Sequence, residues 1–140
     1  MTGTAGSRPA HVLAGMAVLV CALSGCSASP TAPVENYAGT PKNTDIELDV
    51  GGFGGAWLDD GERFAVTVSG SSTCPRTGSG YSVSGTNEIT VTLEEIPADK
   101  ACTADFAPHT TVFRATDDLD PAQELTVTVE ASTFGIPALR

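Results

Sequence analysis

The chain has 140 residues, with 17 Asp and Glu against 7 Lys and Arg and a formal net charge of −10 at pH 7. A surface this acidic repels the phosphates of nucleic acids, so we exclude DNA and RNA binding. A chain of this length holds one small domain and no more.

The N-terminal residues have the pattern of an export signal. Arg8 and the free N-terminus precede an apolar run over residues 12–23. A membrane-spanning helix needs about 20 apolar residues, so this shorter run predicts the apolar region of a signal peptide. A buried N-terminal helix is the alternative interpretation.

The sequence LSGC at residues 23–26 resembles the lipobox of bacterial lipoproteins. The resemblance implies that residues 1–25 are cleaved off and that Cys26 carries acyl chains such as palmitate. Each buried methylene contributes about 0.8 kcal/mol, so several chains hold a protein firmly on the outer face of the cell membrane. The alternative is an ordinary secretory signal in which Cys26 stands by chance.

Two cysteines remain in the domain, Cys74 and Cys102. Loss of the leader also removes Arg8, which leaves six Lys and Arg against 17 Asp and Glu and a formal charge of −11. One cysteine pair in an exported domain normally forms a disulfide, which contributes roughly 3–4 kcal/mol to stability. A catalytic thiol and a metal site are the alternatives, although two Cys and His109 make an incomplete zinc ligand set.

Residues 26–44 predict a lipidated cysteine followed by a disordered tether. The stretch is rich in Ser, Ala, Pro and Thr, a composition that buries too little apolar area to fold. We therefore place the folded domain at residues 45–140.

From residue 45 onward apolar residues alternate with polar ones, which predicts half-buried strands with Thr on the solvent side. The alternating apolar sets are Ile46, Leu48 and Val50; Phe64, Val66 and Val68; Tyr81 and Val83; Ile89, Val91 and Leu93; Phe113; and Leu125, Val127 and Val129. Residues 81–95 predict a hairpin that turns at residues 84–87, and the glycines at 51–55 predict a flexible or bulged connection.

Six or seven short strands separated by turns predict an all-β fold. We expect an antiparallel β-sandwich of the immunoglobulin-like kind with one disulfide, and a small β-barrel is the alternative. Cys74 follows the strand at residues 64–68, and Cys102 precedes the strand around Phe113. The disulfide is therefore expected to pin two loops near one pole of the sandwich, unlike the central bridge of antibody domains.

Three segments carry a family resemblance: AWLDDG at residues 56–61, GSSTCP at 70–75 and ACTADFAPHTT at 101–111. Together with the LSGC motif they resemble a widespread family of uncharacterised actinobacterial lipoproteins. The resemblance spans residues 57–129 and implies a secreted β-domain with one disulfide in a Gram-positive envelope. It implies no activity.

The disulfide-constrained loops are the candidate binding surface, because a rigid loop loses less entropy on binding. The candidate contact residues are Ser71, Ser72, Thr73, Asp105 and His109. We expect Asp105 to accept hydrogen bonds from backbone N–H groups of these loops. Trp57 is expected to pack in the core or at its rim, with an exposed binding anchor as the alternative.

Carboxylates gather in the predicted turns: Asp59, Asp60, Glu62, Asp117, Asp118 and Asp120. We interpret them as solvated turn charges. Calcium binding is the alternative, although their spacing does not match an EF-hand loop. We expect no metal and no cofactor.

The sequence predicts a lipid-anchored, monomeric cell-surface β-domain that acts by binding an envelope protein, a glycan or a small solute. One alternative is a secreted hydrolase that uses His109, the one histidine beyond the leader, although no Gly-x-Ser-x-Gly motif accompanies it. Another alternative is an immunoglobulin-like protease inhibitor, which would need a long exposed loop.

Overall fold

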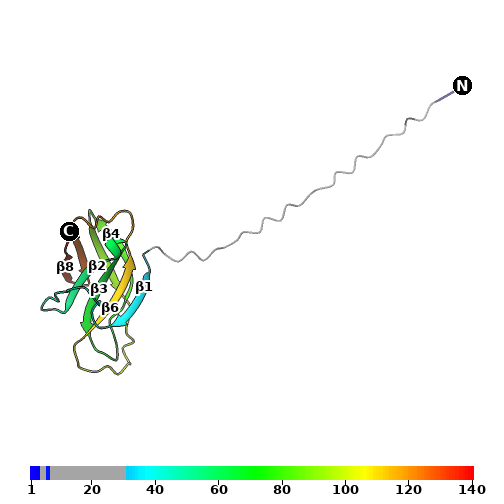
Figure 1. The fold of residues 1–140 in the computed structure, drawn as a ribbon. Coiled ribbons are helices and arrows are strands. Elements are labelled where there is room, and N and C mark those ends of the chain that lie inside the picture. Colours follow the sequence, from blue (N-terminus) through cyan, green and yellow to red (C-terminus); the bar gives the residue numbers. More distant parts are fainter. Residues whose placement is uncertain (4–5, 7–30) are drawn as a thin grey trace.

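The computed structural model describes residues 1–3, 6 and 31–140. The predicted signal peptide, the lipobox with Cys26 and the first part of the predicted tether lie outside the described residues. Residues 31–140 form two stacked four-stranded sheets (Figure 1). The predicted β-sandwich is thus confirmed, and the sheets do not close into a barrel.

The first sheet has the strand order β1-β6-β3-β2 and the second β4-β5-β7-β8. The strands are β1 (Pro33–Ala38), β2 (Phe53–Leu58), β3 (Arg63–Gly70), β4 (Gly78–Gly85), β5 (Glu88–Leu93), β6 (Ala107–Arg114), β7 (Leu125–Val129) and β8 (Ser132–Ile136). This makes eight strands in the described part, against the six or seven expected.

The second sheet is mixed rather than antiparallel. β5 and β7 run parallel, with Ile89 opposite Val127, because the chain crosses to β6 in the first sheet between them. The predicted hairpin is confirmed, since Val83 on β4 pairs with Ile89 on β5 across the turn.

The predicted tether is wrong for residues 33–38, which form β1 and pair antiparallel with β6. β1 is an edge strand, and its side chains are half-buried or exposed. The sequence of β1 therefore lacks the apolar alternation that predicts a domain boundary at residue 45. The backbone pairing that orders this segment leaves no signature in side-chain hydropathy.

Residues 46–50 do not form the strand that the alternation of Ile46, Leu48 and Val50 predicts. The Asp49 carboxylate accepts hydrogen bonds from the N–H groups of Gly51, at 2.8 Å, and Phe53, at 2.9 Å, and so folds the chain back on itself. Ile46 and Leu48 are half-buried, and Val50 is exposed at the tip of this turn.

The glycine-rich stretch at residues 53–58 forms β2 instead of the expected flexible connection. A Cβ on Gly54 would lie 2.8 Å from the Glu47 carbonyl oxygen, and one on Gly55 would lie 2.6 Å from the Ala65 carbonyl oxygen. The glycines therefore serve close packing on both faces of the strand, a known reason for glycine within strands.

Aromatic rings fill the space between the sheets. Phe64 lies 5.5 Å from Phe113 and 5.1 Å from Tyr81, measured between ring centroids, and Trp57 contacts Phe64 edge-on at 5.9 Å. The expected packing role of Trp57 is confirmed, since only 5% of it is exposed. Offset and edge-to-face pairs of this kind add about 0.5–1.5 kcal/mol each beyond area burial.

The outer face of the first sheet is covered as well. Thr67 on β3 and Thr110 on β6 are fully buried, whereas the alternation predicts Thr on the solvent side. The Gly39 carbonyl oxygen accepts the Thr110 hydroxyl, and Ile46 and Leu48 lie against β2. The segment that follows β1 thus forms a cover that strand periodicity does not reveal.

Candidate functional site

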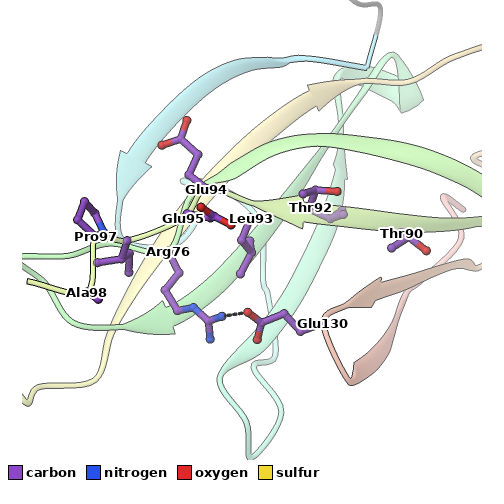
Figure 2. Close-up of a pocket in the computed structure, with 11 residues that line it drawn as sticks. Arg76, Thr90, Thr92, Leu93, Glu94, Glu95, Pro97, Ala98 and Glu130 are labelled. Atoms are coloured by element: carbon purple, nitrogen blue, oxygen red, sulfur yellow. Dashed lines mark hydrogen bonds and ion pairs between the residues drawn. The ribbon is translucent and has the colours of Figure 1, made fainter.

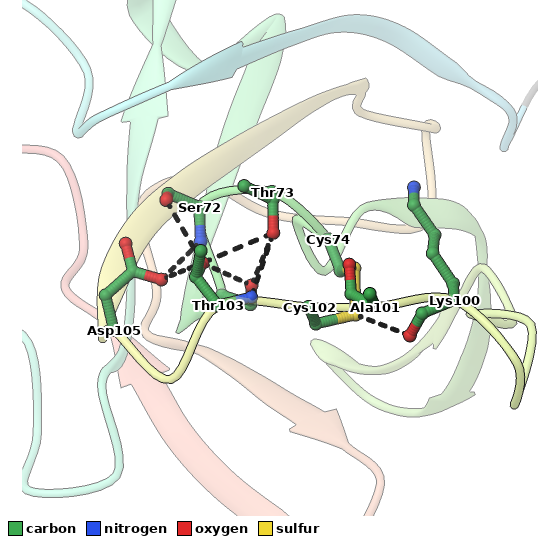
Figure 3. Close-up of a disulfide and its surroundings, with 9 residues drawn as sticks. Ser72, Thr73, Cys74, Lys100, Ala101, Cys102, Thr103 and Asp105 are labelled. Atoms are coloured by element: carbon green, nitrogen blue, oxygen red, sulfur yellow. Dashed lines mark hydrogen bonds between the residues drawn. A yellow bond between two sulfur atoms is a disulfide. The ribbon is translucent and has the colours of Figure 1, made fainter.

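The disulfide between Cys74 and Cys102 is confirmed. It joins the β3–β4 loop to the β5–β6 loop, with a Cα–Cα distance of 5.5 Å and a sequence separation of 28 residues. Cys74 is buried, with 1% exposed. As expected, the bridge holds two loops together at one pole of the sandwich, which we call the disulfide pole (Figure 3).

A cluster of hydroxyl groups lies to one side of this bridge (Figure 3). The Ser/Thr cluster comprises Ser71, Ser72, Thr73, Thr103 and Asp105. The Thr103 hydroxyl lies 2.9 Å from that of Ser71, and the Thr103 N–H donates to the Thr73 hydroxyl at 3.0 Å. The structure therefore brings four of the five predicted contact residues together around Thr103 (Figure 3).

Thr103 belongs to a predicted contact loop but is not among the five predicted contact residues, although a signal for it exists. It follows Cys102 directly, and Thr73 directly precedes Cys74. A disulfide places the chain neighbours of its two cysteines close together. The pairing of the cysteines therefore contains the information that these two threonines meet.

Asp105 has the predicted structural role. Its Oδ1 accepts the Ser72 N–H at 3.0 Å and the Thr103 hydroxyl (Figure 3). Hydrogen bonds from Ser72 and then Thr103 lower the pKa of Asp105 from 3.8 to about 2. The carboxylate is therefore charged at pH 7.

The residue that follows Asp105 in the chain is aromatic. Phe106 is 66% exposed, yet a Cβ on Gly52 would lie 2.5 Å from the Phe106 Cζ atom. Gly52 has a φ of +76°, which disfavours any other residue there. The close approach of Gly52 thus supports an exposed aromatic side chain, a type of residue enriched where proteins bind partners.

His109 does not join the cluster. It lies on β6 opposite Val68 and Ala38, and its buried Nε2 atom has no hydrogen-bond partner within residues 31–140. Burial lowers the pKa of His109 below its usual 6.5. The imidazole is therefore neutral at pH 7 and packs within the sandwich, apart from the other four predicted contacts.

A wide groove of about 890 Å³ opens near the disulfide pole on the outer face of the second sheet (Figure 2). Thr90 and Thr92 of β5 lie along it, and residues 94–98 line it as well. The Arg76 guanidinium forms an ion pair with Glu130 there. This groove combines hydroxyl, carboxylate and apolar groups, and the sequence did not predict it.

The acidic turns gather at the opposite pole. Asp60, Glu62 and Asp117 line one shallow pocket there. Within the described ranges, no three His, Cys, Asp or Glu side chains are arranged to hold a metal ion. Asp120 accepts hydrogen bonds from the Ala122 N–H at 2.9 Å and the Gln123 amide at 2.7 Å, as a turn carboxylate does.

The chain matches no protein-family model, no curated protein and no solved structure. Among the described residues, no helix has the length and hydropathy that crossing a membrane requires.

Proposed function

We propose that the protein is a lipid-anchored binding domain of the cell surface, acting through the disulfide pole on another component of the cell envelope. The observation that carries the proposal is the rigid Ser/Thr cluster beside the exposed ring of Phe106. Two loops joined by a disulfide and by side-chain hydrogen bonds lose little conformational entropy when they bind. The resemblance to actinobacterial lipoproteins supports the anchor at Cys26.

The topology supports a definite orientation. On β1, Pro33 pairs with Phe113 and Ala38 pairs with His109, while β6 begins at Ala107 beside the disulfide pole. The chain therefore enters the sandwich at the pole opposite the Ser/Thr cluster (Figure 1). A domain anchored through its N-terminus would present the cluster away from the membrane.

The distance to the membrane is short in this arrangement. The Thr31 carbonyl oxygen accepts the Tyr81 N–H at 3.3 Å, so Thr31 is already attached to the sandwich. Five residue steps separate Cys26 from Thr31, and a fully extended chain spans at most about 3.4 Å per residue, or about 17 Å here. The lipid anchor would thus hold the acidic pole close to the membrane surface.

The anchor is tested by intact mass of the protein extracted from membranes. We expect acyl chains on Cys26 and release of the Cys26→Ser variant into the medium. An unmodified soluble product from the native chain would overturn the anchor.

The binding surface is tested by capture from solubilised envelope, with native and variant domains compared. Phe106→Ala removes the exposed ring without touching the core, and Asp118→Asn alters an exposed loop at the opposite pole. We expect Phe106→Ala to lose the captured component and Asp118→Asn to retain it. Equal capture by both variants would exclude the disulfide pole as the binding surface.

One observation favours a second candidate, a protease inhibitor. Residues 94–101, between β5 and the disulfide, are all exposed. The Lys100 N–H donates to the Pro97 carbonyl oxygen at 3.0 Å, which forms a tight turn in this loop. An inhibitor needs such a loop to enter a protease cleft. Titration against a panel of proteases would show stoichiometric loss of activity, and no loss with any of them would exclude this function.

A further inference from the structure

A second hollow lies on the outer face of the first sheet, where residues 35–42, part of the predicted tether, lie against the end of β2 and the start of β3. It has a volume of about 540 Å³ and is lined by Glu35, Tyr37, Lys42, Leu58, Asp59 and Arg63 among others. β1 contributes Glu35 and Tyr37, which share the outward face of the strand because they are two residues apart.

Arg63 organises the polar groups of this pocket. Its guanidinium Nη1 lies 3.6 Å from Glu35, and its Nε donates to the Asp59 carboxylate. The side chain therefore bridges from β3 across to β1. Planar guanidinium and carboxylate groups held in this way present several donors and acceptors in fixed directions.

Two further donors face no partner from the protein. Neither the Tyr37 phenol nor the Lys42 ammonium makes a hydrogen bond or ion pair within residues 31–140. Burial, followed by the charge of Glu35, raises the pKa of Tyr37 above its usual 10.0. The phenol is thus half-buried and protonated, and its O–H is available to a ligand.

The pocket is electrically balanced although the chain is strongly acidic. Glu35 and Asp59 oppose Lys42 and Arg63, so the lining has no formal net charge, whereas the whole chain has −10. The two carboxylates would repel an anionic ligand, and the two basic groups would repel a cationic one. The balance favours a neutral ligand that both donates and accepts hydrogen bonds.

We propose that this pocket binds one sugar unit of a neutral saccharide. Each sugar hydroxyl can donate to Glu35 or Asp59 and accept from Arg63. The Tyr37 ring and Leu58 offer apolar surface to the C–H groups of the sugar ring. A few polar groups that fix orientation beside apolar surface are the usual composition of a small-molecule site.

This site goes beyond the proposed function. It needs neither the lipid anchor nor the Ser/Thr cluster, and its residues do not overlap with either. Loss of binding at the disulfide pole would therefore leave it intact.

The test uses the chain from residue 27 to 140, which contains all eight strands of the described sandwich. The probes are neutral oligomers of glucose, mannose, galactose and arabinose, with oligogalacturonate as the anionic comparison. Binding is followed by amide chemical-shift changes in NMR and by calorimetry. We expect at least one neutral series to bind and to shift the amide signals of Tyr37, Lys42 and Arg63, with weaker binding of oligogalacturonate.

Variants locate the site. We expect Tyr37→Ala and Arg63→Gln each to weaken saccharide binding at least tenfold. Lys42 is exposed, so we expect Lys42→Ala to fold as the native chain does. We expect this variant to weaken saccharide binding as well. The matched control Lys100→Ala removes the same charge at the disulfide pole and should bind as the native chain does.

Three outcomes would overturn the proposal of saccharide binding. They are no binding of any neutral oligomer at millimolar concentration, preferential binding of oligogalacturonate, and binding that Lys42→Ala and Tyr37→Phe leave unchanged. Thermal unfolding of each variant distinguishes lost binding from lost folding.

Discussion

Thr67 on β3 and Thr110 on β6 are direct cross-strand partners, and their hydroxyl oxygens lie 2.8 Å apart with neither side chain exposed. The Thr110 hydroxyl donates to the Gly39 carbonyl oxygen at 2.7 Å. Because a threonine hydroxyl has one proton, Thr67 must be the donor to Thr110. This chain of two hydrogen bonds ties the sheet to the segment that covers its outer face.

Thr110→Val keeps the shape of the side chain and removes the middle of this chain. The half-buried Gly39 carbonyl and the buried Thr67 hydroxyl would lose their partner, which costs about 2–3 kcal/mol. Urea unfolding measures the loss. The control Thr92→Val, at an exposed position of β5, should change stability by less than about 0.5 kcal/mol, and equal effects of the two variants would contradict the hydrogen-bond chain.

Gly55→Ala is expected to destabilise the sandwich by about 2 kcal/mol or more, because overpacking strains a filled core. The added Cβ would lie 2.6 Å from the Ala65 carbonyl oxygen and 2.7 Å from Ile136 Cδ1. Gly80→Ala is the matched control, since its nearest atom would be the Thr31 carbonyl oxygen at 3.5 Å. A difference in thermal midpoint between the two variants checks the prediction, and similar midpoints would count against it.

Replacing both Cys74 and Cys102 with alanine should lower the free energy of unfolding by roughly 3–4 kcal/mol, since the unfolded chain regains loop entropy. Urea unfolding of the oxidised protein and of the double variant measures this. Peptide mapping without reductant should recover the two cysteines in one linked fragment, and free thiols on both would refute the bridge.

Asp105 should make stability depend on pH in strong acid. Its pKa is about 2 in the folded chain against 3.8 as a model value, so folding favours the charged form. The stabilisation is complete above about pH 5 and is lost as the pH falls through 3.8 toward 2. Asp105→Asn should flatten the unfolding curve in this window, and an unchanged pH dependence would show that the hydrogen bonds from Ser72 and Thr103 do not form.

His109 should make stability depend on pH in a milder range, near neutrality. Burial lowers its folded pKa below 6.5, so below pH 6.5 the unfolded chain takes up a proton that the folded chain resists. Stability is therefore full above this pH and declines as the pH falls below it, until the folded pKa is reached. Thermal midpoints between pH 7 and 5 should decline less for His109→Gln than for the native chain. An equal decline would mean that the imidazole is solvated.

The comparison of β7 with β1 shows what periodicity can reveal. Leu125, Val127 and Val129 alternate cleanly with threonines, and β7 occupies those residues. β1 lies at a sheet edge and contributes little to the core, so its sequence resembles that of a tether. Edge strands are held by backbone hydrogen bonds, which every residue can accept and every residue except proline can donate, whatever its side chain.

The candidate sites divide in the same way. The Ser/Thr cluster follows from two cysteines with polar neighbours, and the sequence identified most of it. The pocket of Tyr37 and Arg63 joins β1 to β3, which lie on either side of β6. No local sequence pattern predicts that β1 and β3 belong to the same sheet.

The sequence by itself determined the all-β class, the disulfide, the hairpin of β4 and β5 and the acidic surface. Each of these depends on side-chain alternation, turn residues or charge, which are local properties of the chain. Only the tertiary structure decided that β5 and β7 run parallel, that residues 33–38 join the sheet and that Thr67 and Thr110 are buried. Strand order, cover segments and pockets arise from contacts between residues far apart in the chain. The free energy of these contacts depends on both partners, so it cannot be inferred from the sequence of either segment alone.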